Sequence, residues 1–292
     1  MSARTDLTVV LTFDVDGETL WTSRDANSRI GPVMLSQGAY GPLEGVPRIL
    51  RLLRKHDLRA TFFVTGYVVD HYPDRCRDIV AAGHEIAHHT YGHEWPSRVD
   101  AQSERRSFVR ALQSIERLTG RKPAGYRAPG WELSDSTFGL VREFGIEYTS
   151  NMMDGEHPYE LTVSGAPTGV IELPCSWVLD DAAFFMYGLT YDPPQFAPSQ
   201  VYEQWMGEFE GMRAERDGRV YVLTLHPQII GRASRMAMLD RLVAAMKRRG
   251  GVAFSTAGAA AAAARRAGGT RTREYDGSRA LLQAEGLHTE RQ

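Results

Sequence analysis

Short apolar runs of strand length alternate along this chain with amphipathic helical patterns, and this alternation restricts the fold more than any other feature. Residues 7–13 are rich in β-branched side chains, residues 44–56 carry Val46 and Ile49 at helical spacing, and residues 60–64 form the next apolar run. Such alternation predicts βαβ units and therefore an α/β fold with a parallel sheet, closed as a barrel or open.

The same pattern continues to the Ala-rich segment near the C-terminus. We expect further strands at 84–88, 125–128, 146–150, 169–173, 219–225 and 251–254, and helices at 73–82, 100–118, 134–144, 199–216, 235–249 and 256–266. With no internal repeat and no obvious linker, residues 1–267 are predicted to form one domain, followed by a polar tail over 268–292. Residues 21–43 and 152–168 are predicted to be long loops that cover a site.

Composition excludes several classes of function. A net charge of −2 gives no electrostatic basis for binding nucleic acid or an anionic membrane. The sequence holds no stretch of about 18 apolar residues and no apolar signal-peptide core at its start. The two cysteines, Cys76 and Cys175, are far apart and read as reduced thiols, so a cytoplasmic location is expected.

Metal-binding side chains follow two of the predicted strands. Asp14 and Asp16 close the first apolar run, and His89 and His93 close a later one; two histidines four apart present their nitrogens on one side of a helical turn. Taken alone, an Asp-x-Asp is more often a turn-capping acid, and a His-x-x-x-His can be a solvated polar turn. Together the residues suffice for one divalent metal and one general base, and a His₂-carboxylate set leaves a coordination position for water.

Other polar groups follow further strands in order. Arg127 and His226 also lie at or just past predicted strand ends, where catalytic groups of a (β/α) barrel gather. His84 and His88 are left outside the metal shell because side chains alternate along a strand.

Five motifs in this order resemble the polysaccharide deacetylase (NodB-homology) family, carbohydrate esterase family four. The resemblance covers about residues 8 to 265 and rests on Thr12-Phe-Asp-Val-Asp-Gly17, His89-Thr-Tyr-Gly-His93, Arg127-Ala-Pro-Gly130, Trp177-Val-Leu-Asp-Asp181 and Leu223-Thr-Leu-His226. It implies a distorted (β/α) barrel of about seven strands and hydrolysis of a non-peptide C–N bond.

The resemblance also implies a role for each motif residue. Asp16, His89 and His93 would bind a divalent metal, with zinc expected from the ligand types. Asp14 would be the general base, Arg127 would orient it, and His226 would be the general acid that protonates the leaving nitrogen.

Several aromatic and acidic residues are expected around the substrate. Trp131 and Trp177 are expected to wall the pocket, although either could belong to the core, and Trp21 and Tyr91 complete the aromatic set. Asp181, or its neighbour Asp180, could tune His226, pair with Arg127, or be a surface acid.

Val15 separates the two acids of the first motif, and this departure, with Glu18 and Trp21, resembles an intracellular subgroup. That subgroup includes peptidoglycan-deacetylase-like enzymes and cyclic-amide hydrolases of the allantoinase type, which tend to form homo-oligomers. The expected function is deacetylation of an N-acetyl sugar in carbohydrate metabolism. Hydrolysis of a small cyclic amide or imide is the alternative, and a non-catalytic binding module is a third reading that the intact motif residues disfavour.

Overall fold

A mostly parallel β-sheet forms the centre of the molecule. The computed structural model describes residues 5–23, 30–163, 165–187, 195–267 and 271–275. Their strands form one sheet in the order β10-β6-β7-β5-β4-β3-β2-β1-β8, with β9 paired to β1. The strands are β1 (Leu7–Val15), β2 (Thr61–Val64), β3 (Glu85–His88), β4 (Gly125–Tyr126), β5 (Tyr148–Thr149), β6 (Tyr159–Val163), β7 (Ala166–Glu172), β8 (Arg219–Leu225), β9 (Val252–Ser255) and β10 (Arg271–Glu274).

Seven of these strands, β1 to β5, β7 and β8, pair in parallel with one another, and among the described strands only β6 and β7 pair antiparallel. The segment after β7 then reaches β8, where Asp180 forms an isolated parallel bridge with Thr224 and the Asp181 amide donates to the Thr224 carbonyl at 3.1 Å. This contact joins the two ends of the seven-strand path. The predicted α/β class is confirmed.

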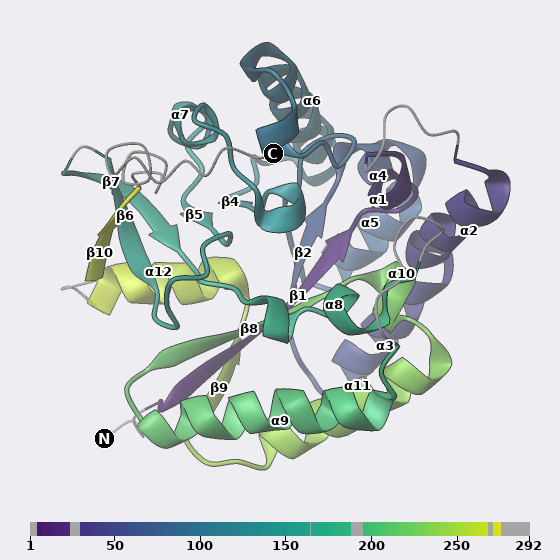
Figure 1. The fold of residues 1–292 in the computed structure, drawn as a ribbon, viewed down its shortest axis with the longest axis vertical. Helices are drawn as coiled ribbons and strands as arrows, with labels where there is room; N and C mark the ends of the chain where they lie inside the picture. The colour runs from purple at the N-terminus through teal and green to yellow at the C-terminus, as the bar shows by residue number, and fades with distance from the viewer. Residues whose placement is uncertain (1–4, 24–29, 164, 188–194, 268–270, 276–292) are drawn as a thin grey trace, which may run out of the picture.

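Helices cover the outside of the sheet (Figure 1). They are α1 (Thr19–Thr22), α2 (Pro32–Tyr40), α3 (Val46–Lys55), α4 (Gly66–His71), α5 (Pro73–Ala81), α6 (Ala101–Thr119), α7 (Thr137–Glu143), α8 (Ala182–Phe185), α9 (Pro198–Glu215), α10 (Pro227–Ile230), α11 (Ala233–Lys247) and α12 (Ala257–Ala267). Helices α9 and α11 pack side by side, and α4 packs on both α5 and α6.

Alternation along β1 separates the apolar core from the site. Val9, Leu11 and Phe13 belong to the large core cluster that includes residues of α3 and α11, whereas Val10 belongs to a second cluster with residues of β8 and α12. Successive side chains of a strand point to opposite faces. Thr12 and Asp14 therefore lie on the same face of β1 as Val10. Along this face the side chains change from apolar, next to α12, to polar at the C-terminal end of β1.

The structure differs from the expected elements in several places. Residues 152–168 are not one long loop, because β6 pairs with β7 as a hairpin whose turn contains Gly165 at φ +73°. Residues 30–43 of the other expected loop hold α2 and the start of a π-helical turn (Gly41–Gly45), while residues 24–29 lie outside the described part. The short helices α1, α4, α8 and α10 were not expected.

The described residues of the expected polar tail belong to the sheet, because β10 pairs in parallel with β6. The side chain of Glu274 accepts a hydrogen bond from the Thr162 hydroxyl at 2.6 Å. The domain boundary at residue 267 stays a prediction, and the described tail docks on the body of the protein. No helix in the described ranges is both long and apolar enough to cross a membrane.

Candidate metal centre and active site

Asp16, His89 and His93 come together past the ends of β1 and β3. Nε2 of His89 lies 3.4 Å from Oδ1 of Asp16, and Nε2 of His93 lies 3.9 Å from the same oxygen. All three residues are buried, and their potential ligand atoms lie within 4.8 Å of one another. Asp16 Oδ1 is also a buried oxygen that accepts no hydrogen bond from the described part of the chain. A buried acceptor without a donor is costly unless something else satisfies it, so this donor set fits a cation.

Electrostatics keep the Asp16 carboxyl group ionised. Burial alone would raise its pKa, but His93, His89 and His226 outweigh that effect and lower the pKa to about 2. An ionised carboxylate is the form that binds a metal.

The neighbours of these three residues orient the atoms that face the cluster. Nδ1 of His89 lies 2.7 Å from the Arg127 carbonyl, which can only accept, so this nitrogen carries a proton, and in the neutral imidazole Nε2 keeps the lone pair. The side-chain amide of Gln228 donates to Oδ2 of Asp16 at 3.0 Å, which leaves Oδ1 as the oxygen on the imidazole side. The hydroxyl oxygen of Ser23 lies 2.9 Å from Nδ1 of His93, within hydrogen-bond distance.

The turn that carries the two histidines is not the expected helical turn. Thr90 and His93 have φ values of 56° and 60°, in the left-handed region that costs a non-glycine residue energy. Neighbouring groups hold this backbone: the Gly92 amide donates to Glu94 at 2.8 Å, and the Tyr91 amide donates to the Ser107 hydroxyl at 3.0 Å. The two imidazole rings still meet, with their centroids 5.2 Å apart.

Arg127 and Asp14 form a buried ion pair. Nη1 of Arg127 donates to Oδ1 of Asp14 and to the Thr12 hydroxyl, both at 2.8 Å, and Nη2 donates to the Ser150 hydroxyl at 2.9 Å. The guanidinium is fully buried over the Phe63 ring, 4.2 Å from its centroid. The arginine therefore fixes one oxygen of Asp14 at the edge of the cavity described below.

His226, at the end of β8, is held from behind by Asp181. Nδ1 of His226 lies 2.6 Å from Oδ1 of Asp181, whose two oxygens also accept from the His226 amide at 3.1 and 3.0 Å. Burial lowers the His226 pKa, but Asp180 and Asp181 outweigh it and leave the pKa well above 6.5. Oδ1 of Asp180 lies 3.7 Å from the same Nδ1. Burial and the neighbouring Asp181 raise the pKa of Asp180 to about 7, although His226 acts to lower it.

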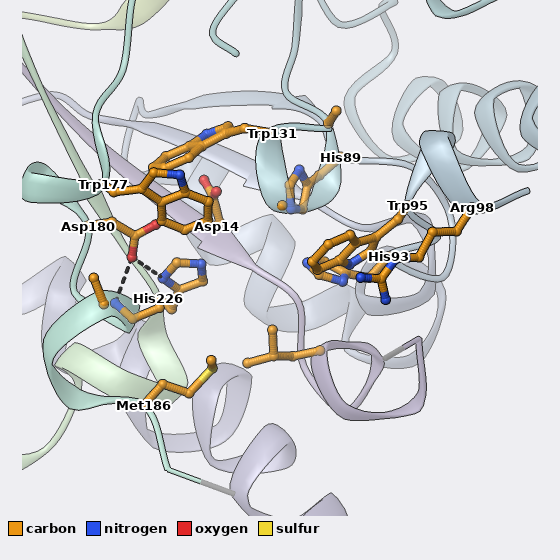
Figure 2. A pocket seen from close by; sticks show the side chains of 15 residues that line it. Asp14, His89, His93, Trp95, Arg98, Trp131, Trp177, Asp180, Met186 and His226 are labelled. Atoms are coloured by element: carbon orange, nitrogen blue, oxygen red, sulfur yellow. Dashed lines mark hydrogen bonds and ion pairs between the residues drawn. The ribbon is translucent and has the colours of Figure 1, made fainter. Parts of the chain in front are cut away.

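A cavity of about 580 Å³ joins these groups (Figure 2). Its polar wall includes Asp14, Asp180, His89, His93 and His226. Its other lining residues are Leu20, Trp95, Arg98, Ala128, Gly130, Trp131, Trp177, Ala182, Ala183 and Met186. This volume falls in the range of small-molecule sites.

The structure places some of the expected pocket residues at the cavity and others away from it. Trp131 and Trp177 line the cavity and pack edge to face with their centroids 4.5 Å apart, so both belong to the wall. Asp181 lies behind His226. Trp21 lines a smaller neighbouring cavity of about 270 Å³, and Tyr91 lies over Arg110 with its hydroxyl 3.2 Å from Asp70. None of these last three is among the residues that line the larger cavity within the described part of the chain.

The two histidines left outside the metal shell lie elsewhere. Nε2 of His88 donates to the Phe108 carbonyl at 2.9 Å, and its Nδ1 accepts from the Thr90 amide at 3.2 Å. His84 accepts from the Ala60 amide at 3.3 Å and lines a different cavity. Burial lowers the pKa of each to about 4, so both are neutral at pH 7.

Several contributors to the site were not expected at these positions, among them Trp95, Arg98, Gln228 and Ser23. Gln228 stands two residues after His226 and could have been noticed for that reason. The other three lie in irregular segments or at a helix end, where the sequence has no helix or strand periodicity from which to predict the direction of a side chain.

A mostly parallel α/β fold with a buried Asp-His-His cluster at its strand ends defines the class of metal-assisted hydrolases built on a barrel. Comparison with known proteins makes this specific. The sequence profile of the polysaccharide deacetylase family matches residues 2–149, about half of the chain, and the chain belongs to that family. The enzymes of this family are metal-dependent deacetylases, which are hydrolases acting on C–N bonds.

Similar proteins cover nearly the whole chain. The peptidoglycan deacetylase of Helicobacter pylori is 28% identical over 276 residues, covering 86% of this chain and 94% of that protein. A crystal structure from Mycobacterium smegmatis, described provisionally as a polysaccharide deacetylase, is 37% identical, covers 93% of this chain and 94% of that one, and superposes with a TM-score of 0.85. A crystal structure of the Puue allantoinase has a TM-score of 0.79 at 23% identity and covers 90% of this chain and 91% of that one, so it shows a shared fold alone.

Proposed function

We propose that this protein removes the acetyl group from an N-acetylated sugar, with Asp16, His89 and His93 as the ligands of a divalent metal. The observation that carries the proposal is the buried Asp16 Oδ1, which accepts no hydrogen bond within the described residues and faces both imidazole Nε2 atoms. A divalent cation there would supply Lewis acidity, which polarises a carbonyl group and makes water more acidic. We further propose zinc, because one carboxylate and two imidazoles suit it.

Asp14 is proposed as the general base. It lines the cavity, and the buried Arg127 holds one of its oxygens by a charge-assisted hydrogen bond. A carboxylate fixed in this way can take a proton from the attacking water without losing its position. Arg127 is a positioning residue in this proposal.

His226 is proposed as the general acid. Asp181 binds its Nδ1, and the other ring nitrogen, Nε2, lies 4.0 Å from Oδ2 of Asp16, toward the candidate metal ligands. The raised pKa of His226, caused by Asp180 and Asp181, keeps a proton available for the nitrogen that leaves when the C–N bond breaks.

The roles of the two acids can be separated by experiment. Asp14→Asn should keep the metal and reduce acetate release by a factor of about 10² to 10⁴, as expected for loss of a positioned base. Asp16→Asn is the matched variant, and it should lose the metal together with activity. Loss of metal from Asp14→Asn with retention in Asp16→Asn would reverse the assignment.

The substrate class needs a second measurement. Acetylated chito-oligomers should release acetate, while hydantoins and cyclic imides should be poor substrates. The reverse order would favour the cyclic-amide alternative, and no turnover of either set by metal-loaded protein would favour a binding module.

We also propose a cytoplasmic location and a homo-oligomer. Two buried, unpaired cysteines, Cys76 and Cys175, support a reducing compartment. The homo-oligomer rests on the resemblance to the subgroup named above, and Val33 and Leu43, which are 77% and 53% exposed, are apolar side chains that a second copy would cover. Cell fractionation and analytical ultracentrifugation test the two statements.

A further inference from the structure

The cavity has different charges on its two sides. Asp14, Asp180 and His226 lie on one side with Trp131 and Trp177, and Trp95 and Arg98 lie on the other side, beyond the two imidazoles of His89 and His93 (Figure 2). Arg98 is the one arginine or lysine among the lining residues that the described chain contributes.

Arg98 is exposed, and its turn places its side chain next to Trp95. Residues Pro96–Arg98 form a 3₁₀ turn in which the Arg98 amide donates to the Trp95 carbonyl at 2.9 Å, and such a turn brings residues three apart to the same side. The guanidinium then lies over the Trp95 indole, 4.0 Å from the ring centroid.

The Trp95 indole has a fixed position as well, because it packs against the backbone of Gly130. Gly130 has φ +62°, and a Cβ atom added there would lie 3.0 Å from Cζ2 of the indole. Only glycine combines this backbone conformation with so close an approach. The Trp95–Arg98 pair is therefore a supported platform at the edge of the cavity.

Arg98 forms no ion pair with any residue in the described part of the chain. The two acids of the cavity already have other partners: Arg127 binds Asp14, and the Ala182 amide donates to Oδ1 of Asp180 at 2.6 Å. An arginine that is fixed by an aromatic ring and left without an acid offers its donors to a ligand.

We propose that Arg98 binds an anionic group of the substrate, so that this protein prefers an N-acetylated sugar that carries a carboxylate. The inference rests on the proposed function for the identity of the sugar. The acetamide would lie among His89, His93 and His226, and the carboxylate would lie on the Trp95 side, away from Asp14 and Asp180.

Binding of ligands that cannot be hydrolysed tests this without relying on turnover. The probes are N-methanesulfonyl-glucosamine, its 3-O-carboxymethyl ether, its C6 uronic acid and the methyl ester of each acid, titrated into the metal-loaded protein by calorimetry. At least one acid should bind about tenfold more tightly than its own ester, and added salt should reduce this difference.

Two substitutions of Arg98 and one control complete the test. Arg98→Gln should abolish the preference for the acid, and Arg98→Lys should restore part of it, because lysine keeps the charge but loses the planar pair of donors. Arg110→Gln is the matched control, since Arg110 also lies over an aromatic ring, that of Tyr91 at 3.5 Å, but does not line the cavity, and it should keep the full preference.

Equal binding of acid and ester by the wild-type protein, no binding of either acid at millimolar concentration, or an undiminished preference in Arg98→Gln would each overturn the proposal. The proposed function fails separately. An anion preference in the binding assay, combined with no acetate release from N-acetyl sugars, would refute the deacetylase assignment and leave the role of Arg98 standing.

Discussion

Replacing Arg127 with methionine should reveal how strongly the site is held together. The guanidinium is fully buried and donates to Asp14, to Thr12 and to both the hydroxyl and the carbonyl of Ser150, the last at 3.3 Å. Methionine fills much of the same volume but offers no donor. The Asp14 carboxylate, which is only 3% exposed, would remain charged and lose its cation.

Breaking a buried ion pair by removing one partner costs about 3–5 kcal/mol, because the remaining charge is neither solvated nor paired. We therefore expect the free energy of unfolding of Arg127→Met to fall by about that amount. Asp14→Asn should also destabilise, since it leaves a buried cation whose remaining acceptors are neutral. The double variant should lose less than the sum of the two, with a coupling energy of about 1–3 kcal/mol.

Urea unfolding of the four proteins after treatment with a chelator measures this coupling without a contribution from metal binding. Arg110→Met is the control, because its guanidinium lies over the Tyr91 ring and no acid is paired with it among the described residues. The free energy of unfolding of this control should fall by no more than about 0.5 kcal/mol, as for an ordinary surface change. If the loss of unfolding free energy in the double variant equals the sum of the two single losses to within about 0.5 kcal/mol, the ion pair is refuted as the main contribution of Arg127.

Four further outcomes are expected. His93→Ala should lose its metal while its circular dichroism stays native, and full metal content would exclude His93 as a ligand. Gln228→Leu should weaken metal affinity about 10- to 100-fold, as is usual for residues that orient a ligand, and an unchanged affinity in a chelator competition would contradict that role. Burial, with Arg59, lowers the His84 pKa to about 4, so the unfolded chain binds more protons than the folded protein between pH 6.5 and 4, and stability falls on acidification through this range. His84→Gln should remove about 1–2 kcal/mol of the stability that the wild-type protein loses between pH 7 and 5. Parallel plots of unfolding free energy against pH for the two proteins would refute this. The cavity volume suits one or two sugar units, so a long N-acetylglucosamine polymer should release acetate much more slowly than short oligomers, and equal rates would show an open groove.

Much of the candidate site could be predicted from the sequence because it depends on strand ends. In a parallel sheet the carboxyl ends of the strands lie at one edge, so residues after separate apolar runs must converge. Asp14, Asp16, Arg127 and His226 follow from this rule. His89 also follows, although the helical turn expected between it and His93 is absent.

The remaining details depend on geometry that no periodicity encodes. Trp21 and Tyr91 are aromatic residues next to motif positions, but local backbone conformation turns their side chains away from the larger cavity. Trp95 and Arg98 reach it through a short 3₁₀ turn, which leaves no pattern longer than three residues. The strand β10 was missed because its sequence, Arg-Thr-Arg-Glu, is polar and forms an edge.

The position of β1 has a consequence for how a ribosome makes this protein. This strand holds Asp14, leads directly into Asp16, and pairs with β8 and β9, whose residues follow it by more than 200 positions. The N-terminal segment therefore leaves the ribosome long before its partners and exposes an apolar edge that can pair with other chains. A fragment that stops at residue 149, where the family match ends, would retain Asp14, Asp16, His89, His93 and Arg127 and still lack the two strands that cover that edge. Such a fragment should collect in inclusion bodies, so dissection of this enzyme has to proceed by point substitution within the intact chain.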